Sequence, residues 1–469
     1  MSSPDSNGQV TQAACAFIEA ARYRDIPAEA VAIARRCILD GLGLYVAGSA
    51  EESVRILIAE ALETGGREEA LLLGAGDRKV PAAMAARVLG TAGHAHDWDD
   101  TQVSRDPRHQ YGLLTHPTVA PLTAALVMSQ RRGEVTGEEF VTAFLSGFEV
   151  ESKISEWMLP DHYQRGFHSS GTVGTIGACV AAAKLLGLRG RELAHALGIA
   201  ASFAAGIRAN FGTMTKPLHM GRAAENGVTA ATLAACGYTA DPAALDGPWG
   251  FFSVLGGGVS EEKLGQGFGR TWSIVDPGVS IKPYPSGILT HQAMDAMLAL
   301  VVEHDLRPDD VDRIMFYAGN NILKPIRYAK ASNHLEAKFC MPALLAMMIL
   351  RRKAGRREFE DGFIRSPEMQ TMQGRITTRL DPEIDALGTD RIRSSIELTT
   401  RSGEVLVRWA DERYRGGPDN PLSDAELERK VTSCTEGLLD EQRRERLIAV
   451  AWKVETLTDA SLLARLLQT

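Results

Sequence analysis

The chain has 469 residues, of which 45% are hydrophobic and 23% are charged, and its formal net charge is -8 at pH 7. This length allows two or three domains, each with its own apolar core. The acidic balance excludes a broad basic surface of the kind that binds nucleic acid or anionic membranes, so any positive charge for an anionic ligand has to be local.

The N-terminus and the cysteines indicate where the protein works. The segment MSSPDSNGQVTQ lacks a cationic stretch followed by an apolar one, and no uninterrupted apolar run approaches the roughly 20 residues of a membrane span. The six cysteines are scattered without a C-x-x-C motif, and most lie in apolar runs. We therefore expect a cytoplasmic protein with reduced thiols and no membrane partner.

The spacing of apolar residues in the first half of the chain predicts packed helices. From Val10 to about Ala235, apolar residues recur every three or four positions in a segment rich in Ala, Leu and Gly. The predicted helices cover residues 27–47, 54–63, 81–92, 117–130, 136–157, 170–186, 189–204 and 221–235.

The pattern changes at GGGVSEEKLGQGFG (256–269), which we interpret as the junction between two folding units. A phosphate-binding loop is the rival interpretation, although the G-x-x-x-x-G-K-[ST] pattern is missing. Beyond the junction, alternation predicts strands in 312–319 and in 392–410, with a hairpin turn at 401–403. Helices at 287–304 and 334–351 make this unit α+β. The helical stretch 423–467 either completes the second unit or packs back on the first.

The first polar cluster is GHAHDWDDT (93–101), which is followed by THP at 115–117. Two histidines and three aspartates within seven residues exceed what a helix end needs. A metal-dependent hydrolase built on His94, His96 and Asp99 is one interpretation. A non-catalytic interpretation is that the aspartates only cap a turn and the histidines are structural.

Three further segments carry polar groups that suit an anionic ligand. In DHYQRGFHSSGT (161–172), Tyr163 and His168 precede a helix N-terminus, which favours a carboxylate or serves capping alone. RANFGTMTKPLHMGRAAENG (208–227) is a dense cationic group in an acidic protein, which is typical of an anion site or of a solvated basic face. In SIKPYPSG (280–287), two prolines fix the loop that carries Lys282.

Taken in this order, the motifs D-x-D-D-T, T-H-P, G-F-H, T-K-P-L-H and K-x-Y-P resemble those of the MmgE/PrpD family. DGLGLYVAGS (40–49), GFEVESKI (147–154) and EAKFCMPALLA (336–346) support the resemblance, which covers nearly the whole chain. Members include 2-methylcitrate dehydratase, cis-aconitate decarboxylase and iminodisuccinate epimerase. The resemblance implies a mainly α fold in which both chain ends (1–270 and 416–469) form a large all-helical domain around an inserted α+β lid (271–415).

The resemblance also implies a homodimer, a site beneath the lid, and no metal or organic cofactor. It implies that a small polycarboxylate is the ligand. The basic cluster adds two further expected substrate ligands, His219 and Arg208. The predicted catalytic residues are Tyr163, His168, Lys216, Asp97 and His116, and the predicted substrate-binding residues are Thr101, Lys282, His219 and Arg208.

The predicted activity is that of a cofactor-independent lyase that abstracts an α-proton from a di- or tricarboxylate, as a citrate or 2-methylcitrate dehydratase does. Tyr163 or His168 would be the base. An epimerase that uses Tyr163 and Lys216 as opposed proton carriers is the alternative within the family. Gly287 stands where cis-aconitate decarboxylases place a histidine, which disfavours that reaction. A metal-dependent hydrolase and a non-catalytic binding protein are the alternatives from other classes.

Overall fold

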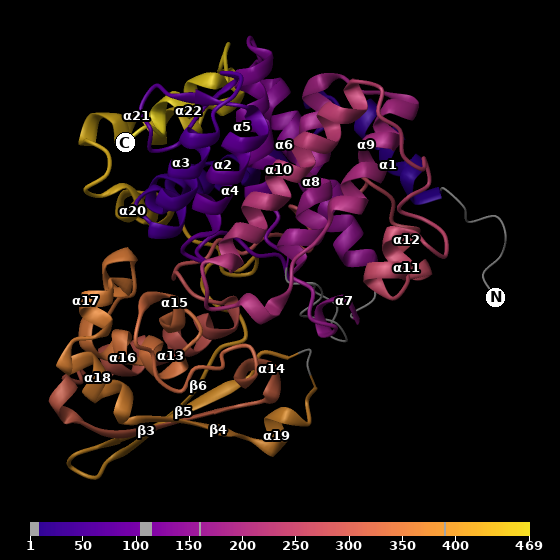
Figure 1. The fold of residues 1–469 in the computed structure, drawn as a ribbon. Coiled ribbons are helices and arrows are strands. Elements are labelled where there is room, and N and C mark those ends of the chain that lie inside the picture. Colours follow the sequence, from indigo (N-terminus) through magenta and orange to yellow (C-terminus); the bar gives the residue numbers. More distant parts are fainter. Residues whose placement is uncertain (1–8, 104–114, 159–160, 389–390) are drawn as a thin grey trace.

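The computed structural model describes residues 9–103, 115–158, 161–388 and 391–469. It consists of a large helical unit and a smaller α+β unit, which lie one above the other in Figure 1. One apolar core contains buried residues from Val10 to Ile281 and again from Leu422 to Leu467. A second core contains residues from Tyr284 to Tyr414. The protein is therefore mainly α with a smaller α+β region, as the sequence predicts.

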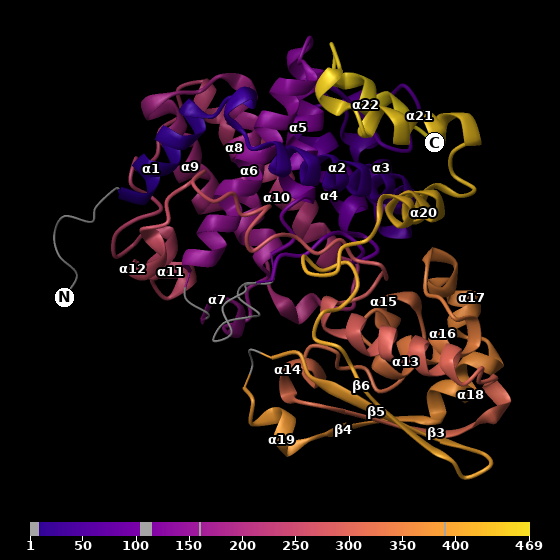
Figure 2. The ribbon, with the colours of Figure 1, turned by 180° about the vertical axis from the view of Figure 1, so that it is seen from behind.

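The helical unit is built from both ends of the chain. Of the two placements that the sequence leaves open for residues 423–467, the structure has the one on the first unit, where α20 packs on α2 (Figure 2). Its longer helices are α1 (Gln9–Ala20), α2 (Ala28–Ser49), α3 (Glu52–Thr64), α4 (Ala82–His94), α5 (Val119–Arg132), α6 (Gly137–Trp157), α8 (Ser169–Leu186), α9 (Gly190–Phe203), α10 (Thr215–Ala235), α20 (Asp424–Thr435) and α21 (Glu441–Ala451). The short ones are α7 (Asp161–Gln164), α11 (Phe251–Gly256), α12 (Glu261–Leu264) and α22 (Ser461–Leu466), beside a hairpin of β1 (Ala70–Leu71) and β2 (Lys79–Val80).

Helix α8 runs through the centre of this unit. By length and composition it could cross a membrane, yet 89% of that stretch is buried inside the protein. Its run of small residues allows α10 to approach closely, since a Cβ atom on Gly227 of α10 would lie 2.5 Å from the Cβ of Ala178. Close packing of small residues, and not contact with lipid, explains the apolar composition of α8.

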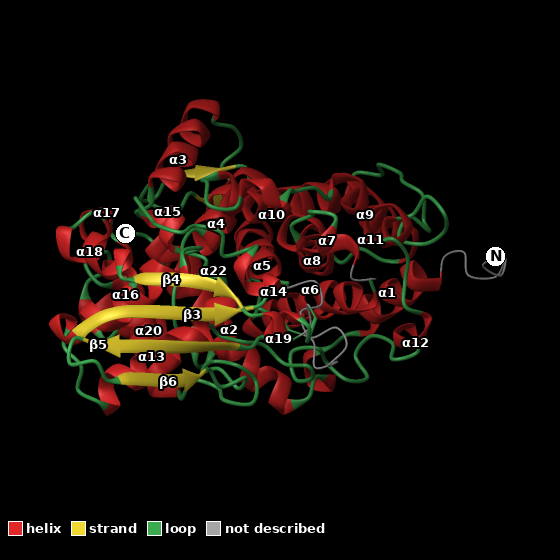
Figure 3. Ribbon diagram, turned by 90° about the horizontal axis from the view of Figure 1, so that it is seen from below, coloured by secondary structure: helices red, strands yellow, loops and turns green. Residues whose placement is uncertain are grey.

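The α+β unit carries a four-stranded sheet in the order β4-β3-β5-β6 (Figure 3). Strand β4 is parallel to β3, and the other neighbours are antiparallel. The strands are β3 (Val311–Ala318), β4 (Ile376–Leu380), β5 (Ser394–Thr400) and β6 (Val405–Trp409). The helices are α13 (His291–Glu303), α14 (Asn320–Leu323), α15 (His334–Ala337), α16 (Met341–Arg351), α17 (Asp361–Ile364), α18 (Pro367–Gly374) and α19 (Pro382–Asp385). In Figures 1 and 2, α13, α15 and α16 lie between the sheet and the helical unit.

Two differences from the predicted elements bear on the site. The predicted helix 334–351 is broken between Ala337 and Met341, where Pro342 lies in the first turn of the second helix. Helix α10 begins at Thr215, six residues before the predicted start at 221, because Pro217 falls in the first turn, where a backbone N–H has no partner in the helix. Lys216 therefore lies in the first turn of α10.

The segment between the two cores also differs from the predicted boundary at 270. Trp272, Ile274, Val279 and Ile281 pack in the core of the helical unit. The glycine-rich stretch before them turns repeatedly in this unit, with positive φ at Gly257, Gly258, Gly267 and Gly269. Such conformations favour glycine, so the composition of this stretch reflects tight turns.

Candidate active site

The turn after α4 carries Asp97, whose backbone has a φ of 52°. Aspartate adopts this left-handed conformation more readily than most residues do. The Nζ atoms of Lys216 and Lys282 each lie 2.9 Å from Asp97 Oδ1. Lys282 also donates to the carbonyl oxygen of Asp97 at 2.8 Å. One buried carboxylate thus holds together two ammonium groups that come from α10 and from the segment before α13.

A histidine and a second aspartate extend this cluster. Lys216 Nζ lies 2.9 Å from His94 Nε2 at the end of α4. His94 Nδ1 lies 2.8 Å from Asp99 Oδ2, and the same oxygen lies 3.2 Å from His116 Nδ1. Asp99 therefore orients two imidazole rings, and its pKa lies well below the usual range because these two partners outweigh the effect of burial.

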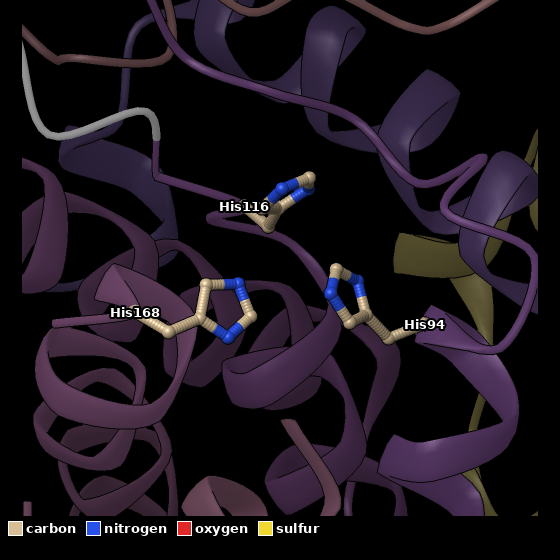
Figure 4. Close-up of side chains that lie close together, drawn as sticks. All are labelled: His94, His116 and His168. Atoms are coloured by element: carbon tan, nitrogen blue, oxygen red, sulfur yellow. The ribbon is translucent and has the colours of Figure 1, made fainter. Parts of the chain in front are cut away.

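Figure 4 shows three histidine rings around a common space. The ring centroids of His94 and His116 are 4.7 Å apart, and those of His94 and His168 are 5.6 Å apart. These rings come from the end of α4, the segment before α5 and the residue before α8. Three separate segments of the helical unit thus bring imidazoles to one place.

A pocket lies where this cluster faces the α+β unit. The helical unit contributes most of its polar groups, and the α+β unit contributes an apolar wall. The pocket has a volume of about 50 Å³, whereas ligand pockets measure about 300–1,000 Å³. It has to widen before a substrate can enter. The residues that line it are Asp97, Thr101, His116, Tyr163, His168, Phe211, Lys216, Lys282, Gly287, Ile288, Leu289, Pro325, Ile326 and Phe339.

Seven of the nine predicted site residues thus line one pocket. The other two, His219 and Arg208, lie one layer behind its wall. His219 Nδ1 is 3.0 Å from His168 Nδ1, and the Arg208 guanidinium lies 3.7 Å from the ring centroid of Tyr163. In this structure both residues contact a neighbouring side chain of the site instead of the cavity. Most of the loop between Thr101 and His116 lies outside the described residues.

The histidines of the pocket are neutral near pH 7. Burial, reinforced by Lys216, lowers the pKa of His168 well below its usual value, and burial lowers the pKa of His219 to about 4. Two neutral rings with facing Nδ1 atoms share one proton, so one ring donates and the other accepts. When His168 donates, the lone pair of its Nε2 is available to take a proton from a substrate.

Two further pKa shifts distinguish the proton carriers. Burial raises the pKa of Tyr163, so its phenol stays protonated and is a weak base. Burial lowers the pKa of Lys216, although the Asp97 carboxylate opposes that effect, and the nearby Lys282 adds to it. A lysine whose pKa lies closer to neutrality releases a proton more readily, which suits a general acid.

The predicted metal-ligand set of His94, His96 and Asp99 does not come together in the structure. His96 turns away from this set, and its Nε2 lies 3.6 Å from Glu51. Among the described residues, His94, His116 and His168 do offer nitrogen atoms within 4.8 Å of one another. Both nitrogens of His94 are, however, already paired with Asp99 and Lys216. His94, Asp97, Asp99 and His116 form a second such group, but Asp97 is paired with two lysines and Asp99 with the two histidines, so these donors are already engaged within the protein.

Two buried lysines that the sequence analysis missed also reach the turn. Lys338 donates to the carbonyl oxygen of Ala95, and Lys430 donates to that of Trp98, both at 2.8 Å. Lys338 is followed by an apolar stretch, FCMPALLA, which is an unusual place for an exposed lysine. Lys430 falls on the apolar stripe of α20 beside Leu427 and Val431. Both patterns are detectable signals of burial.

Comparisons with known proteins bear on this geometry. The model of the MmgE/PrpD N-terminal domain matches residues 12–263, and that of the MmgE/PrpD C-terminal domain matches residues 284–456. The chain belongs to the MmgE/PrpD family. The resemblance seen in the sequence is thereby confirmed, and the pocket lies between the two parts of the chain that the family models match.

The curated relatives in the MmgE/PrpD family include three cis-aconitate decarboxylases. The protein from Homo sapiens is 28% identical, with 92% of this chain and 89% of that protein covered. The protein from Mus musculus is 27% identical, with 98% and 93% covered, and that from Aspergillus terreus is 24% identical, with 99% and 97% covered. The similarity therefore extends along nearly the full length of each protein.

Gly287, the residue at which the family resemblance implies a departure from the cis-aconitate decarboxylases, lines the pocket. A Cβ atom at this position would lie 3.3 Å from Ile326 Cδ1 and 3.8 Å from Phe339 Cε1. The apolar side chains of Ile326 and Phe339 thus occupy the space beside Gly287, and a histidine there would have to displace them.

Proposed function

We propose that this protein is a lyase that removes water from a small tricarboxylate of the citrate or methylcitrate type, without a metal or organic cofactor. The observation that carries the proposal is the pairing of Lys216 and Lys282 on one buried oxygen of Asp97, in a pocket that also holds the neutral imidazole of His168. The names of the relatives, which act on a tricarboxylate as cis-aconitate decarboxylases, support the choice of substrate class.

An α-proton beside a carboxylate is very weakly acidic, so fixed positive charge has to stabilise the developing carbanion. In the proposed reaction, His168 Nε2 takes this proton, and the electron pair of the C–H bond forms a carbon–carbon double bond. The bond from carbon to the hydroxyl oxygen breaks, and Lys216 gives a proton to the departing oxygen, so that water leaves. Lys282 and His116 bind substrate carboxylates, and the Thr101 hydroxyl donates a hydrogen bond.

Decarboxylation of cis-aconitate is the second candidate, and the names of the curated relatives favour it. The same cations would bind the substrate, but the bond to a carboxylate carbon would break, carbon dioxide would leave, and the carbanion that remains would take up a proton. Gly287 and its apolar neighbours argue for dehydration instead, because they offer no proton donor at that wall. Epimerisation through Tyr163 and Lys216 remains a third outcome that the same assay detects.

The test is proton NMR in heavy water with citrate, 2-methylcitrate, cis-aconitate and an aspartate-derived diacid as substrates. Dehydration of citrate or 2-methylcitrate produces a new olefinic signal, and decarboxylation of cis-aconitate replaces the substrate signals with those of a product that has one carboxylate fewer. Epimerisation exchanges the α-proton without a new double bond. Lys216→Met is expected to lower kcat by about 100-fold to 10,000-fold, the range for loss of a general acid. Lys184→Met is the matched control, because Lys184 also donates to backbone carbonyls but lies away from the pocket.

Unchanged turnover in a folded Lys216→Met variant would contradict the proposed role of this lysine. If the wild-type protein converts none of these substrates, the proposed lyase function itself is wrong.

A further inference from the structure

Three buried lysines converge on the backbone of the Asp97 turn. Lys338 donates to the carbonyl oxygen of Ala95, Lys282 to that of Asp97 and Lys430 to that of Trp98, each at 2.8 Å. The donors are separated from these acceptors by 243, 185 and 332 residues respectively. A single turn is thus held by three distant parts of the chain.

Two features of this turn explain why hydrogen-bond donors to its carbonyl oxygens stabilise it. It follows the end of α4, where the last carbonyls of a helix lack partners within the helix and the dipole favours cations. The positive φ of Asp97 is a conformation that persists only when its surroundings hold it. Burying each ammonium group costs several kcal/mol. The convergence of three such groups therefore indicates that they hold the turn in position, since they are a costly way to stabilise the protein as a whole.

Lys338 differs from the other two lysines. Lys282 is also paired with the Asp97 carboxylate, and Lys430 lies 2.6 Å from Asp40 Oδ1. In the part of the chain that the structure describes, no carboxylate lies within ion-pair distance of Lys338, although the charges of Glu51 and Asp97 act on it. Its hydrogen bond to Ala95 is therefore its main direct polar contact with the turn.

Lys338 is also the one of the three that the α+β unit contributes, at the end of α15. The next residue, Phe339, lines the pocket and stacks on Phe211 of the helical unit, with ring centroids 5.8 Å apart. At the start of α15, His334 lies 3.3 Å from Glu51 of the helical unit. Helix α15 therefore forms a contact between the two units at the edge of the pocket.

The small pocket connects this contact to substrate entry. A volume of about 50 Å³ holds a few water molecules and no tricarboxylate. Phe339 is part of the apolar wall of this pocket, and Lys338 is the residue before it in the chain. A withdrawal of this wall from the helical unit would break the hydrogen bond from Lys338 to Ala95, and its return would form the bond again.

We propose that Lys338 is a positioning residue, which fixes the Asp97 turn when the α+β unit closes on the helical unit. In the closed form the turn holds Asp97 where it pairs Lys216 with Lys282, and in the open form it is released. The inference rests on the proposed lyase function for its catalytic consequence, but the restraint on the turn can be tested without any substrate.

The first experiment measures hydrogen–deuterium exchange of the full-length protein by mass spectrometry. The amides of Asp97 and Thr101 are bonded to the carbonyl oxygens of His94 and Ser280, so their exchange reports on the turn. In Lys338→Met, exchange within residues 95–103 is expected to become about 10-fold faster or more, with the rest of the helical unit unchanged. Lys184→Met, the control, leaves this segment protected.

The second experiment separates positioning from structure by kinetics. Lys338→Met is expected to lower kcat about 100-fold with a small change in KM, because misplacing catalytic groups affects the transition state more than binding. Lys338→Gln keeps a hydrogen-bond donor and is expected to lie between the Met variant and the wild type in both measurements. It also replaces the Met variant if the latter does not fold.

Unchanged exchange in residues 95–103 overturns the inference, and so does faster exchange spread evenly over the protein, which marks a merely structural role. Faster exchange of the turn with unaltered kcat also overturns it, since the turn then has no role in turnover. If the wild-type protein has no activity on the tricarboxylates, the proposed function fails, while the exchange result still decides whether Lys338 holds the turn.

Discussion

At the scale of single residues, Asp97 links the two ammonium groups of the site. Burial alone would raise the pKa of this carboxyl, but Lys216 and Lys282 outweigh burial, so its pKa lies well below the usual range. The carboxylate is shared by the two ammonium groups and offsets one of their two positive charges. Its loss would leave two like charges together in a buried place.

Asp97→Asn is therefore expected to destabilise the protein. Removing one partner of a buried ion pair costs about 3–5 kcal/mol, so the free energy of unfolding in urea should fall by that order. Asp411→Asn is a matched control on the surface, where the pair with Arg413 contributes at most about 1 kcal/mol. Equal losses in both variants would mean that Asp97 is not the electrostatic link between the lysines.

A neighbouring carboxyl, Asp100, behaves in the opposite way. Burial raises its pKa to about 7, although hydrogen bonding from Thr118 opposes this shift. A raised pKa in the folded state stabilises the fold at low pH, and that contribution is lost as the pH rises towards 7. Asp100→Asn removes this dependence.

We therefore expect the stability of Asp100→Asn relative to the wild type to increase between pH 4 and pH 7. The increase is at most about 1.4 kcal/mol for each pH unit. The measurement is the free energy of unfolding of both proteins at several pH values. A difference that is constant with pH would show that Asp100 is ionised in the folded protein throughout this range.

At the scale of elements, the contact between α4 and α10 sets the distance between His94 and Lys216. His94 is the last residue of α4, and Lys216 lies in the first turn of α10. Between them, Gly221 lets the helices touch, since a Cβ there would lie 2.3 Å from the carbonyl oxygen of Arg87. A larger residue at this point would push the two ends apart.

Gly221→Ala is expected to cost about 1–3 kcal/mol of stability through overpacking, and to lower kcat because the 2.9 Å contact between Lys216 and His94 is disturbed. Gly374→Ala is the control, because a Cβ on that helical glycine meets no atom within 4 Å. That change should be neutral or slightly stabilising. Thermal unfolding and steady-state kinetics of both variants check the expectation, which an unaffected Gly221→Ala protein would contradict.

At the scale of the whole molecule, the proposed anion site is the pocket that residues of both units line. An inert tricarboxylate such as propane-1,2,3-tricarboxylate should bind the folded protein and raise its Tm. When the ligand concentration is 100 times its Kd, the free energy of unfolding increases by about 2.7 kcal/mol. Lys282→Met, measured against its own baseline, should lose most of this shift, whereas sodium chloride at equal ionic strength should not reproduce it. If Lys282→Met shows the same increase in Tm as the wild type, the tricarboxylate binds at another site.

Local patterns in the sequence were sufficient to predict most helices and strands. The spacing of apolar residues predicted the long helices from α2 to α9, and alternation predicted β3 and the hairpin of β5 and β6. These predictions succeed because helix and strand periodicity depend on residues that are close in the chain. Strand β4 was not predicted, since its five residues have little alternation and are specified by parallel pairing with β3.

The order of the motifs in the sequence determined the family and the identity of seven residues that line the pocket. Only the tertiary structure showed that Arg208 and His219 lie behind the pocket wall, and that Lys338 and Lys430 reach the Asp97 turn. The physical reason is distance along the chain. Contacts across 243 or 332 residues depend on which faces of helices pack together, and the sequence around each lysine carries a signal of burial but none of its partner.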